Sequence, residues 1–303
     1  MANRLLMWAA GSPALQRQVT ENPVAQRAAH RFVAGERLDQ ALEVARRLNA
    51  DGIGGILDLL GEGVTDTAGA THAVEQYAEA VSAIASGGLD ATISIKLSQL
   101  GQTVDRAACV LNLIQVLDHA QDNGVTVEID MEDHTLVADT LALYSDAAAG
   151  HPQTRVAIQA MLRRTPFDLE GLATVKPRVR LVKGAYAEPV EVAHQRKPDI
   201  RAQYKVLTDW LFQHGADPAF GTHDGELIDY ARRAATQAGK GPKEYEIQLL
   251  YGIRRDLQHR LAREGHRVRV YIPFGSAWYP YLTRRMAERS ANMLFFARAV
   301  TGK

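Results

Sequence analysis

The chain has 303 residues, of which 46% are hydrophobic, so it can bury one large core or two modest ones. Its 35 Lys and Arg balance its 35 Asp and Glu, so no net field favours nucleic acid or an anionic membrane. A single cysteine, Cys109, excludes a disulfide framework and favours a cytoplasmic location. No apolar run approaches the ~20 residues of a membrane helix, and LLMWAAG near the start is too short for a signal-peptide core. Composition leaves peripheral contact with a membrane open.

The first 50 residues are predicted to be helical, and eight β-like runs follow them. Each run is rich in Val, Ile, Leu or Tyr, as strands are, and amphipathic helical stretches separate most of them. One such helix is expected over 105–124, ending in Asn-Gly, with an apolar stripe formed by Ala108, Leu111, Ile114, Leu117 and Ala120. The expected strands cover 52–60, 91–97, 125–131, 155–161, 178–186, 218–224, 245–252 and 268–275.

Eight strand–helix units in about 250 residues are typical of a (βα)8 barrel, an α/β fold. A doubly wound open sheet is the competing fold, but no G-x-G-x-x-G follows the first strand, and GIGG at 52–55 lies inside it. No linker or change of composition divides the chain. We therefore predict a single domain in which a helical segment, 1–50, packs on a barrel formed by 51–303.

Polar side chains recur near the carboxyl ends of the predicted strands, where barrel enzymes place their active sites. Charged side chains in apolar strands are costly unless they are paired or bind something. One such residue is easily a structural ion pair, but recurrence at the same end of the barrel favours a functional ring. The residues are Glu62, Lys96, Asp130, Glu132, Asp133, Gln159, Arg180, Lys183, Thr222, His223, Asp224, Gln248 and Tyr271.

Two other chemistries are compatible with parts of this ring. Lys96 or Lys183 could form a Schiff base, as the lysine of a barrel aldolase does, although either lysine could equally form an ion pair, Lys96 with Asp130. The run EIDMEDH (128–134) could suggest a metal site, with His134 and His223 as further ligands. Its spacing matches no specific metal pattern, so we expect no metal.

The segment YPYLTRRMAERSANM (279–293) reads as a helix with two adjacent arginines. Tyr281, Arg284, Arg285 and Glu288 fall on one face at helical spacing, and Glu288 can pair with Arg284. Taken alone, this pattern is typical of a solvated helix face. Above a ring of polar strand ends it favours a clamp for an anionic ligand, because the planar guanidinium suits a carboxylate better than an ammonium does.

Several motifs together resemble proline dehydrogenase, the flavin enzyme that opens proline catabolism. They run in order through nearly the whole chain, and the pair RLVKGAY with YLTRRMAERSANM is highly specific. RFVAGE (31–36) and LDLLGE (57–62) also look like this family, and the length resembles that of its small monofunctional bacterial form. The other motifs are SIKLSQLG (94–101), EIDMED (128–133), RLVKGAY (180–186), GTHD (221–224), YEIQLLYG (245–252), VYIPFG (270–275) and the terminal helix.

The resemblance implies a distorted (βα)8 barrel with its last helix over the mouth and FAD bound non-covalently. The implied substrate-binding residues are Lys96, Asp130, Leu250, Tyr271, Tyr281, Arg284 and Arg285. The implied cofactor-binding residues are Gln159, Arg180, Lys183, Gly184, Ala185, Thr222, His223, Gln248 and Glu288. Glu62 and Arg180 would pair as a gate, and Asp224 departs from the Asn of many relatives.

The implied reaction oxidises L-proline to Δ1-pyrroline-5-carboxylate by hydride transfer from C5 to flavin N5, with electrons passed to a quinone. The implied catalytic residues are Lys96 and Asp130, which would tune the protonation of the amine, and Arg180, which would stabilise reduced flavin. A Schiff-base aldolase or lyase using Lys96 or Lys183, and a barrel that only binds a ligand, are the alternatives. We expect a cytoplasmic protein, with peripheral contact at the inner face of the cell membrane left open, and no nucleic-acid partner.

Overall fold

In a computed structural model, which describes residues 29–61 and 63–288, eight parallel strands close into a barrel in sequence order. Each strand pairs with the next, and β1 pairs with β8 to close the ring, with Gly54 opposite Arg269. The predicted (βα)8 barrel is therefore confirmed, and the open sheet is wrong. The strands are β1 Gly54–Leu59, β2 Ala91–Ile95, β3 Val127–Ile129, β4 Arg155–Gln159, β5 Val179–Val182, β6 Ala219–Gly221, β7 Glu246–Leu250 and β8 Arg267–Phe274.

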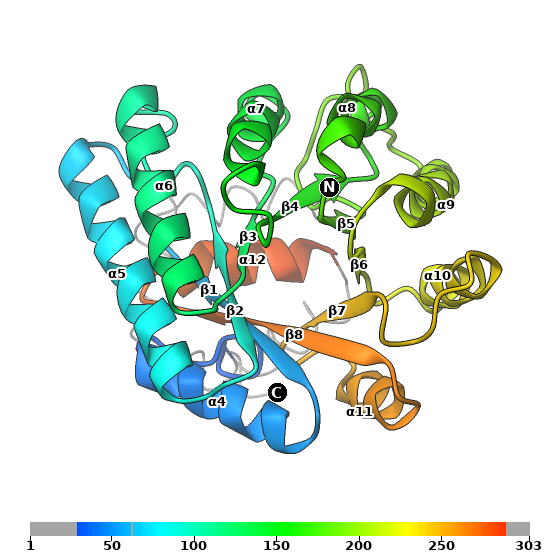
Figure 1. The fold of residues 1–303 in the computed structure, drawn as a ribbon, viewed down its shortest axis with the longest axis horizontal. Helices are drawn as coiled ribbons and strands as arrows, with labels where there is room; N and C mark the ends of the chain where they lie inside the picture. The colour runs from blue at the N-terminus through cyan, green and yellow to red at the C-terminus, as the bar shows by residue number, and fades with distance from the viewer. Residues whose placement is uncertain (1–28, 62, 289–303) are drawn as a thin grey trace, which may run out of the picture.

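Helices surround the strands as an outer ring (Figure 1). Their starts follow local chemistry: the Asp66 carboxylate accepts a hydrogen bond from the Gly69 amide at 2.7 Å, and Asp105 caps the next helix in the same way. The helices are α4 Leu38–Ala50, α5 Thr67–Ser86, α6 Arg106–Asp122, α7 Val137–Ala148, α8 Thr165–Leu172, α9 Lys197–His214, α10 Gly225–Gln237, α11 Arg255–Arg263 and α12 Trp278–Glu288, with a 3-10 turn at Ala173–Val175.

Helix α6 corrects one expectation about which face is buried. It ends at Asp122, before the Asn123-Gly124 stop, as predicted, and Gly124 has a φ of 66°. The predicted stripe is wrong at Leu111, however, because this side chain is 72% exposed. The buried face instead runs through Cys109, Leu113, Val116, Leu117 and Ala120, so it is displaced around the helix from the predicted stripe.

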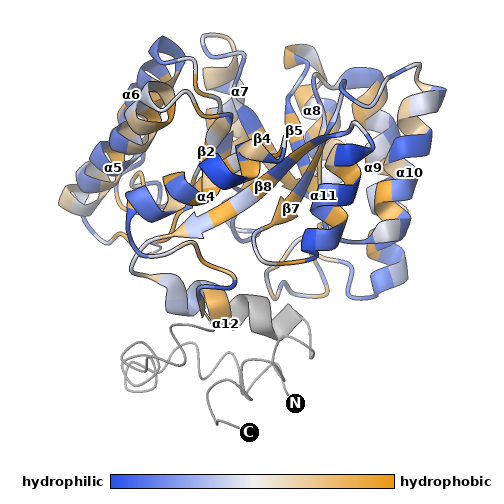
Figure 2. Ribbon diagram, turned by 90° about the horizontal axis from the view of Figure 1, so that it is seen from below, coloured by the Kyte–Doolittle hydropathy of each residue, from blue (hydrophilic) through white to orange (hydrophobic). Residues whose placement is uncertain are grey.

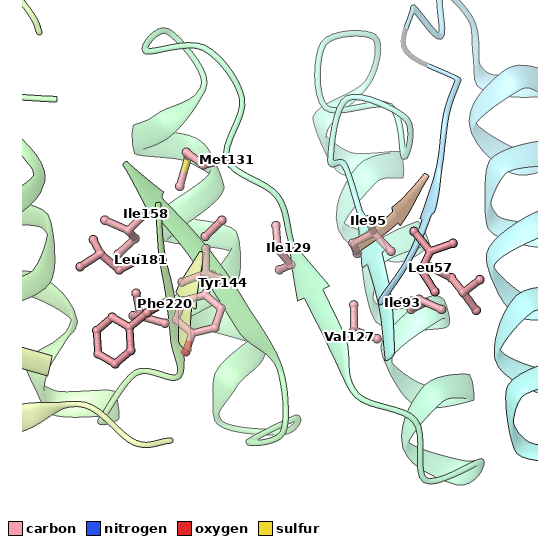
Figure 3. Close-up of a cluster of buried hydrophobic side chains, with 14 of the residues drawn as sticks. Leu57, Ile93, Ile95, Val127, Ile129, Met131, Tyr144, Ile158, Leu181 and Phe220 are labelled. Carbon is pink, nitrogen blue, oxygen red and sulfur yellow. The ribbon is translucent and has the colours of Figure 1, made fainter. Parts of the chain in front are cut away.

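Alternation along the strands divides apolar from polar side chains. Figure 3 shows the apolar set, including Leu57, Ile93 and Ile129, which belongs to the core between barrel and helices. The intervening residues, such as Asp58, Ser94 and Glu128, are polar and hydrogen-bond to residues of other strands. Period-two alternation in β1 to β3 therefore builds an apolar shell and a polar interior from the same short strands.

Buried ion pairs close the amino-terminal end of the barrel. Arg155, the first residue of β4, contacts Glu128 at 3.2 Å and Glu246 at 3.3 Å. Glu246 also accepts hydrogen bonds from Arg267 at 3.2 Å and Arg269 at 3.1 Å. Burial raises the pKa of Glu246, but Arg269 and Arg155 outweigh this effect and lower it to about 2. This end of the barrel is thus filled by matched charges.

The last helix, α12, lies across the opposite end of the barrel, as Figures 1 and 2 show from two directions. A small apolar cluster seats it, in which Trp278 and Leu282 pack with Phe32 and Val33 from the start of the described chain. The Trp278 indole N–H also donates to the Glu36 carboxylate at 3.0 Å. The helix expected over the barrel mouth is therefore present.

The described part of the 1–50 segment packs on the barrel. Helix α4 lies beside β1 and β8, and the Ala34 amide donates to the Pro273 carbonyl at 2.8 Å. Residues 1–28 lie outside the described residues, so the division at residue 50 stays a prediction. Across the ranges that the structure describes, no helix is long and apolar enough to cross a membrane.

Candidate active site

Lys96 occupies the centre of a buried polar cluster at the carboxyl ends of the strands. It directly follows β2, and its ammonium lies 2.7 Å from Asp58 Oδ1 on β1 and 2.9 Å from Asp130 Oδ2, which directly follows β3. The Lys96 and Asp58 side chains are 8% and 1% exposed. A lysine and two carboxylates from neighbouring strands therefore meet almost out of contact with water.

Asp130 accepts hydrogen bonds from four side chains that come from three strands or their ends, β2, β5 and β8. Besides Lys96, it accepts hydrogen bonds from the Ser94 hydroxyl at 2.8 Å and the Tyr271 hydroxyl at 2.6 Å, and it forms an ion pair with Arg180. The Arg180 guanidinium lies 5.3 Å from the centre of the Tyr271 ring, within the range of a cation–π contact. The position of each side chain is thus fixed by at least one other.

The cluster sets clear charge states. Burial would lower the pKa of Lys96, but Asp58 above all outweighs burial and holds this pKa well above its ordinary value. Burial likewise opposes the ionisation of Asp130, yet Lys96 and Arg180 lower the pKa of Asp130 below its ordinary value. Burial raises the pKa of Asp58, against the influence of the Lys96 ammonium. Lys96 is therefore an ammonium and Asp130 a carboxylate at neutral pH.

Two glutamines beside this cluster present unpaired acceptors. Gln248 on β7 donates through its amide nitrogen to Glu128 at 3.0 Å and to Glu246 at 2.7 Å. Gln159 on β4 donates through its amide nitrogen to the Glu132 carbonyl at 2.7 Å. These contacts direct each amide nitrogen to an acceptor, and both amide oxygens are buried without a partner. A ligand with N–H donors could satisfy such oxygens.

Other predicted residues follow β5 and β6. The Lys183 ammonium lies 3.1 Å from the Asp224 carboxylate, which also accepts a hydrogen bond from Arg201 at 2.8 Å. The aspartate at the position where the resemblance implies Asn therefore forms ion pairs. His223 accepts a hydrogen bond from the Leu250 amide at 3.0 Å, which links the ends of β6 and β7. Thr222 is buried, whereas Ala185 is exposed. These residues rim the same end of the barrel as Lys96.

Gly184 shows why a glycine is needed in this rim. Its φ is 109°, and a Cβ there would lie 2.5 Å from the Met161 sulfur and 2.9 Å from the unpaired oxygen of Gln159. Only glycine fits this conformation and this close approach without strain.

The side chains of the remaining predicted residues lie outside the described residues, except for that of Tyr281. Tyr281 is buried and joins the apolar cluster that seats α12. Arg284, Arg285 and Glu288 continue α12, but their side chains lie outside the described residues, as does Glu62. The clamp and the gate therefore stay predictions. Among the described contacts, Arg180 pairs with Asp130 and Glu128.

Comparison with known proteins decides the family. The family model described as proline dehydrogenase matches residues 41–298. The proline dehydrogenase of Deinococcus radiodurans is 39% identical over 282 residues, covering 90% of this chain and 89% of the relative. Proline dehydrogenase 1 of Bacillus subtilis subsp. natto is 34% identical and covers 91% of both chains.

The chain belongs to the proline dehydrogenase family. It is therefore an oxidoreductase that acts on proline in the first step of proline catabolism, and the family is flavin-dependent. Among solved structures, proline utilization A from Bdellovibrio bacteriovorus matches with a TM-score of 0.82 and 23% identity. That match covers 87% of this chain but 33% of the solved one, so the chain spans about a third of its length, and the likeness shows the fold.

Membership of the proline dehydrogenase family leaves the Schiff-base aldolase or lyase without support. The structure supplies a physical reason, because a Schiff-base lysine must shed its proton before it can attack a carbonyl. Lys96 is held as an ammonium by two carboxylates, and Lys183 pairs with Asp224. Within the described residues, no group of three or more His, Cys, Asp or Glu side chains is arranged to hold a metal ion. His134 of the EIDMEDH run instead pairs with Glu188.

The sequence did not single out three members of this proline dehydrogenase cluster: Asp58, Ser94 and Glu128. Asp58 lies inside a run of Leu residues, where one charge has little weight as a pattern. Two features of the sequence could have indicated Asp58. It lies two positions after Ile56, so both side chains fall on the same, inward face of β1, and Lys96 at the end of β2 needs a buried counter-charge.

Proposed function

We propose that the chain binds FAD non-covalently and uses it to oxidise L-proline at C5, with a quinone as the final electron acceptor. The observation that carries this proposal is the buried ammonium of Lys96 between Asp58 and Asp130, at the strand ends where barrel enzymes bind substrates. Proline offers an amine, a carboxylate and an apolar ring, and each would require a different kind of partner. The described residues supply candidates for the first and third.

FAD fits the residues beside the cluster. An isoalloxazine ring carries one N–H donor among several acceptors, and the unpaired oxygens of Gln159 and Gln248 call for such a donor. Gly184 allows a close approach of the chain, and Lys183, Ala185, Thr222 and His223 would line the rest of the cofactor site. When bound, FAD supplies the acceptor for the hydride. The buried cation of Arg180 would stabilise negative charge on the reduced ring.

Lys96 would act on the proline amine through its charge. An ammonium fixed near a second ammonium lowers the pKa of that group, so the substrate amine would lose its proton more easily. A neutral amine has the lone pair that helps hydride to leave C5. Asp130 fixes both Lys96 and Tyr271, and Leu250 at the end of β7 would contact the apolar ring.

The proline carboxylate would be bound by α12. The helix lies across the mouth and is seated by apolar contacts, and its sequence places Tyr281, Arg284 and Arg285 on one face. Two charged hydrogen bonds to one carboxylate would contribute roughly 1.5–3 kcal/mol each. Glu288 would support the clamp or contact the cofactor, and Glu62 with Arg180 would gate the mouth. Transfer of electrons to a quinone would take place during peripheral contact of a cytoplasmic protein with the membrane.

A proline oxidation assay with an artificial electron acceptor and the visible spectrum of the purified protein test this proposal together. We expect a flavin spectrum that proline bleaches in the absence of an acceptor, and turnover when the acceptor is added. A colourless protein that cannot be reconstituted with FAD would refute the cofactor, and a flavoprotein that proline does not reduce would refute the placement of substrate.

The clamp has its own test in Arg284→Met and Arg285→Met, which preserve the helix and most of the apolar stem. The wild type should bind a five-membered cyclic ether acid much more tightly than the same ring without a carboxylate. This preference should shrink in both variants, while flavin content stays constant. Arg263→Met, on the surface helix α11, is the matched control and should retain the full preference. If the two clamp variants also retain it, Arg284 and Arg285 do not bind the carboxylate.

A further inference from the structure

Asp58 has no part in the functions assigned so far, yet it is the most deeply buried partner of Lys96. Its Oδ1 lies 2.7 Å from the Lys96 ammonium, and its side chain is 1% exposed. A buried carboxylate is costly, so its retention beside one lysine calls for an explanation.

The influence of Asp58 on Lys96 differs from that of Asp130. Asp130 divides its negative charge among Lys96, Arg180, Ser94 and Tyr271. Asp58 forms its one described ion pair with Lys96 and is otherwise contacted by the Tyr271 hydroxyl. Asp58 is accordingly the strongest influence that keeps the pKa of Lys96 high against burial.

The other groups that face Lys96 would not replace Asp58. They are Tyr77 from α5, Tyr271 from β8 and Asp130 after β3, and Arg180 from β5 shares Asp130 with Lys96. Both tyrosines have a pKa raised by burial, so they are neutral at physiological pH, and Arg180 is a cation. Without Asp58, Lys96 would have burial and Arg180 opposing its charge and only the shared carboxylate of Asp130 supporting it.

A neutral Lys96 would react with the product of the enzyme. The product is a cyclic imine, and a lysine at the end of a barrel strand is well placed to attack an imine carbon. In that step the Lys96 Nζ adds to C5 and forms a C=N double bond to it, both bonds from C5 to the ring nitrogen break, and the two protons of the neutral Nζ pass to the departing nitrogen, which becomes a primary amine. The exchange needs no oxidant or reductant and would leave the opened product attached to Lys96.

We propose that Asp58 is a positioning residue that keeps Lys96 an ammonium and so protects the enzyme from covalent capture of its own product. An ammonium has no lone pair and cannot attack. This inference rests on the proposed function, because it requires the product to form beside Lys96. It gives the two carboxylates separate tasks: Asp130 fixes several side chains, and Asp58 blocks the nucleophile.

The test compares wild type and Asp58→Asn as flavin-loaded proteins between pH 6 and pH 9. Each is incubated with Δ1-pyrroline-5-carboxylate and cyanoborohydride, which traps imines, and separately with formaldehyde and cyanoborohydride. Peptide mass spectrometry measures adducts on Lys96, and the exposed Lys176 is an internal reference. Glu244→Gln removes an exposed carboxylate that pairs with Lys240 and is the control variant.

We expect both labels at Lys96 to increase with pH in Asp58→Asn, about tenfold for each pH unit by which the lysine pKa falls. Wild type and Glu244→Gln should remain almost unlabelled at Lys96, with unchanged labelling at Lys176. Asn has nearly the same shape as Asp, so Lys96 should stay as buried in Asp58→Asn as in wild type, and a difference in labelling reports the charge of Lys96. General loosening would instead raise labelling at other lysines and reduce flavin content, which would overturn the proposal.

Two further results would also overturn it. Equal labelling of Lys96 in wild type and Asp58→Asn would show that Asp58 does not set its charge. If formaldehyde labelling of Lys96 rises in Asp58→Asn but no product adduct forms, Lys96 has lost its charge without meeting the product, and the proposed position of the substrate is wrong. If Asp58→Asn does not fold, the wild type still decides, because formaldehyde labelling of its Lys96 with a midpoint below pH 9 contradicts a protected ammonium.

Discussion

Removal of both charges of the Lys96–Asp130 pair should destabilise the barrel by less than the two single removals added together. In Asp130→Asn, Lys96 and Arg180 stay buried while one of their carboxylates is lost. Loss of one partner from a buried ion pair costs roughly 3–5 kcal/mol. We expect the lower end of this range, because Asp58 still neutralises Lys96 and Glu128 lies 3.7 Å from Arg180.

Lys96→Met leaves an excess of negative charge instead, because Asp58 and Asp130 then remain near each other without the Lys96 ammonium between them. The double variant restores the balance of charge with Asp58 and Arg180. The loss of unfolding free energy in the double variant should therefore be smaller than the sum of the two single losses by about 2 kcal/mol, within the usual range for residues in contact. Proline turnover should fall in all three variants.

Urea unfolding followed by circular dichroism measures these free energies, with flavin content recorded for each sample. Glu244→Gln is the control, because its ion pair with Lys240 has a similar distance, 3.0 Å, but is exposed on the surface. It should cost less than about 1 kcal/mol. If the losses for Lys96→Met and Asp130→Asn add within about 0.5 kcal/mol, the two residues are independent and the reasoning is wrong.

Three other variants test separate parts of the structure. Arg180→Met should change the reduction potential of the flavin, measured by dye equilibration, and should also lower stability, because it leaves Asp130 and Glu128 with less compensation. Gly184→Ala should reduce the flavin absorbance per protein, because its Cβ would displace Gln159 or Met161; an unchanged flavin content would contradict this. Glu246→Gln should flatten acid unfolding. The pKa of Glu246 is lowered from 4.5 to about 2, so its stabilisation of about 3 kcal/mol is complete above pH 4.5 and is lost as pH falls towards 2. Acid titrations of wild type and variant that run parallel would refute that assignment.

The sequence was sufficient for the barrel because each strand shows its own local signal. Strand-like runs that alternate with helical ones indicate a parallel sheet, and eight of them favour a closed barrel over an open sheet. The carboxyl ends of those strands then converge, which is why Lys96 and Asp130 could be expected to meet. Their separation of 2.9 Å agrees with that expectation.

Contacts between residues on opposite sides of the barrel could not be predicted from local sequence patterns. The pair of Arg155 and Glu246 joins residues 91 positions apart, and its geometry depends on strand tilt and register, which no local pattern reveals. Asp58 was missed because one aspartate among leucines does not alter the apolar character of its strand. The buried face of α6 was misplaced because weakly amphipathic helices allow more than one apolar stripe.

The pairing of β1 with β8 has a consequence for how the enzyme is made. A growing chain contains Asp58, Lys96 and Asp130 long before Tyr271 and α12 leave the ribosome. Until β8 arrives, β1 has an unpaired edge, and one wall of the site is missing. Contacts this distant in sequence form slowly, because a long loop must close first. Proline chemistry therefore begins only after β8 and α12 have been made and have joined the barrel, and any truncation before β8 should leave an aggregation-prone sheet rather than a partly active enzyme.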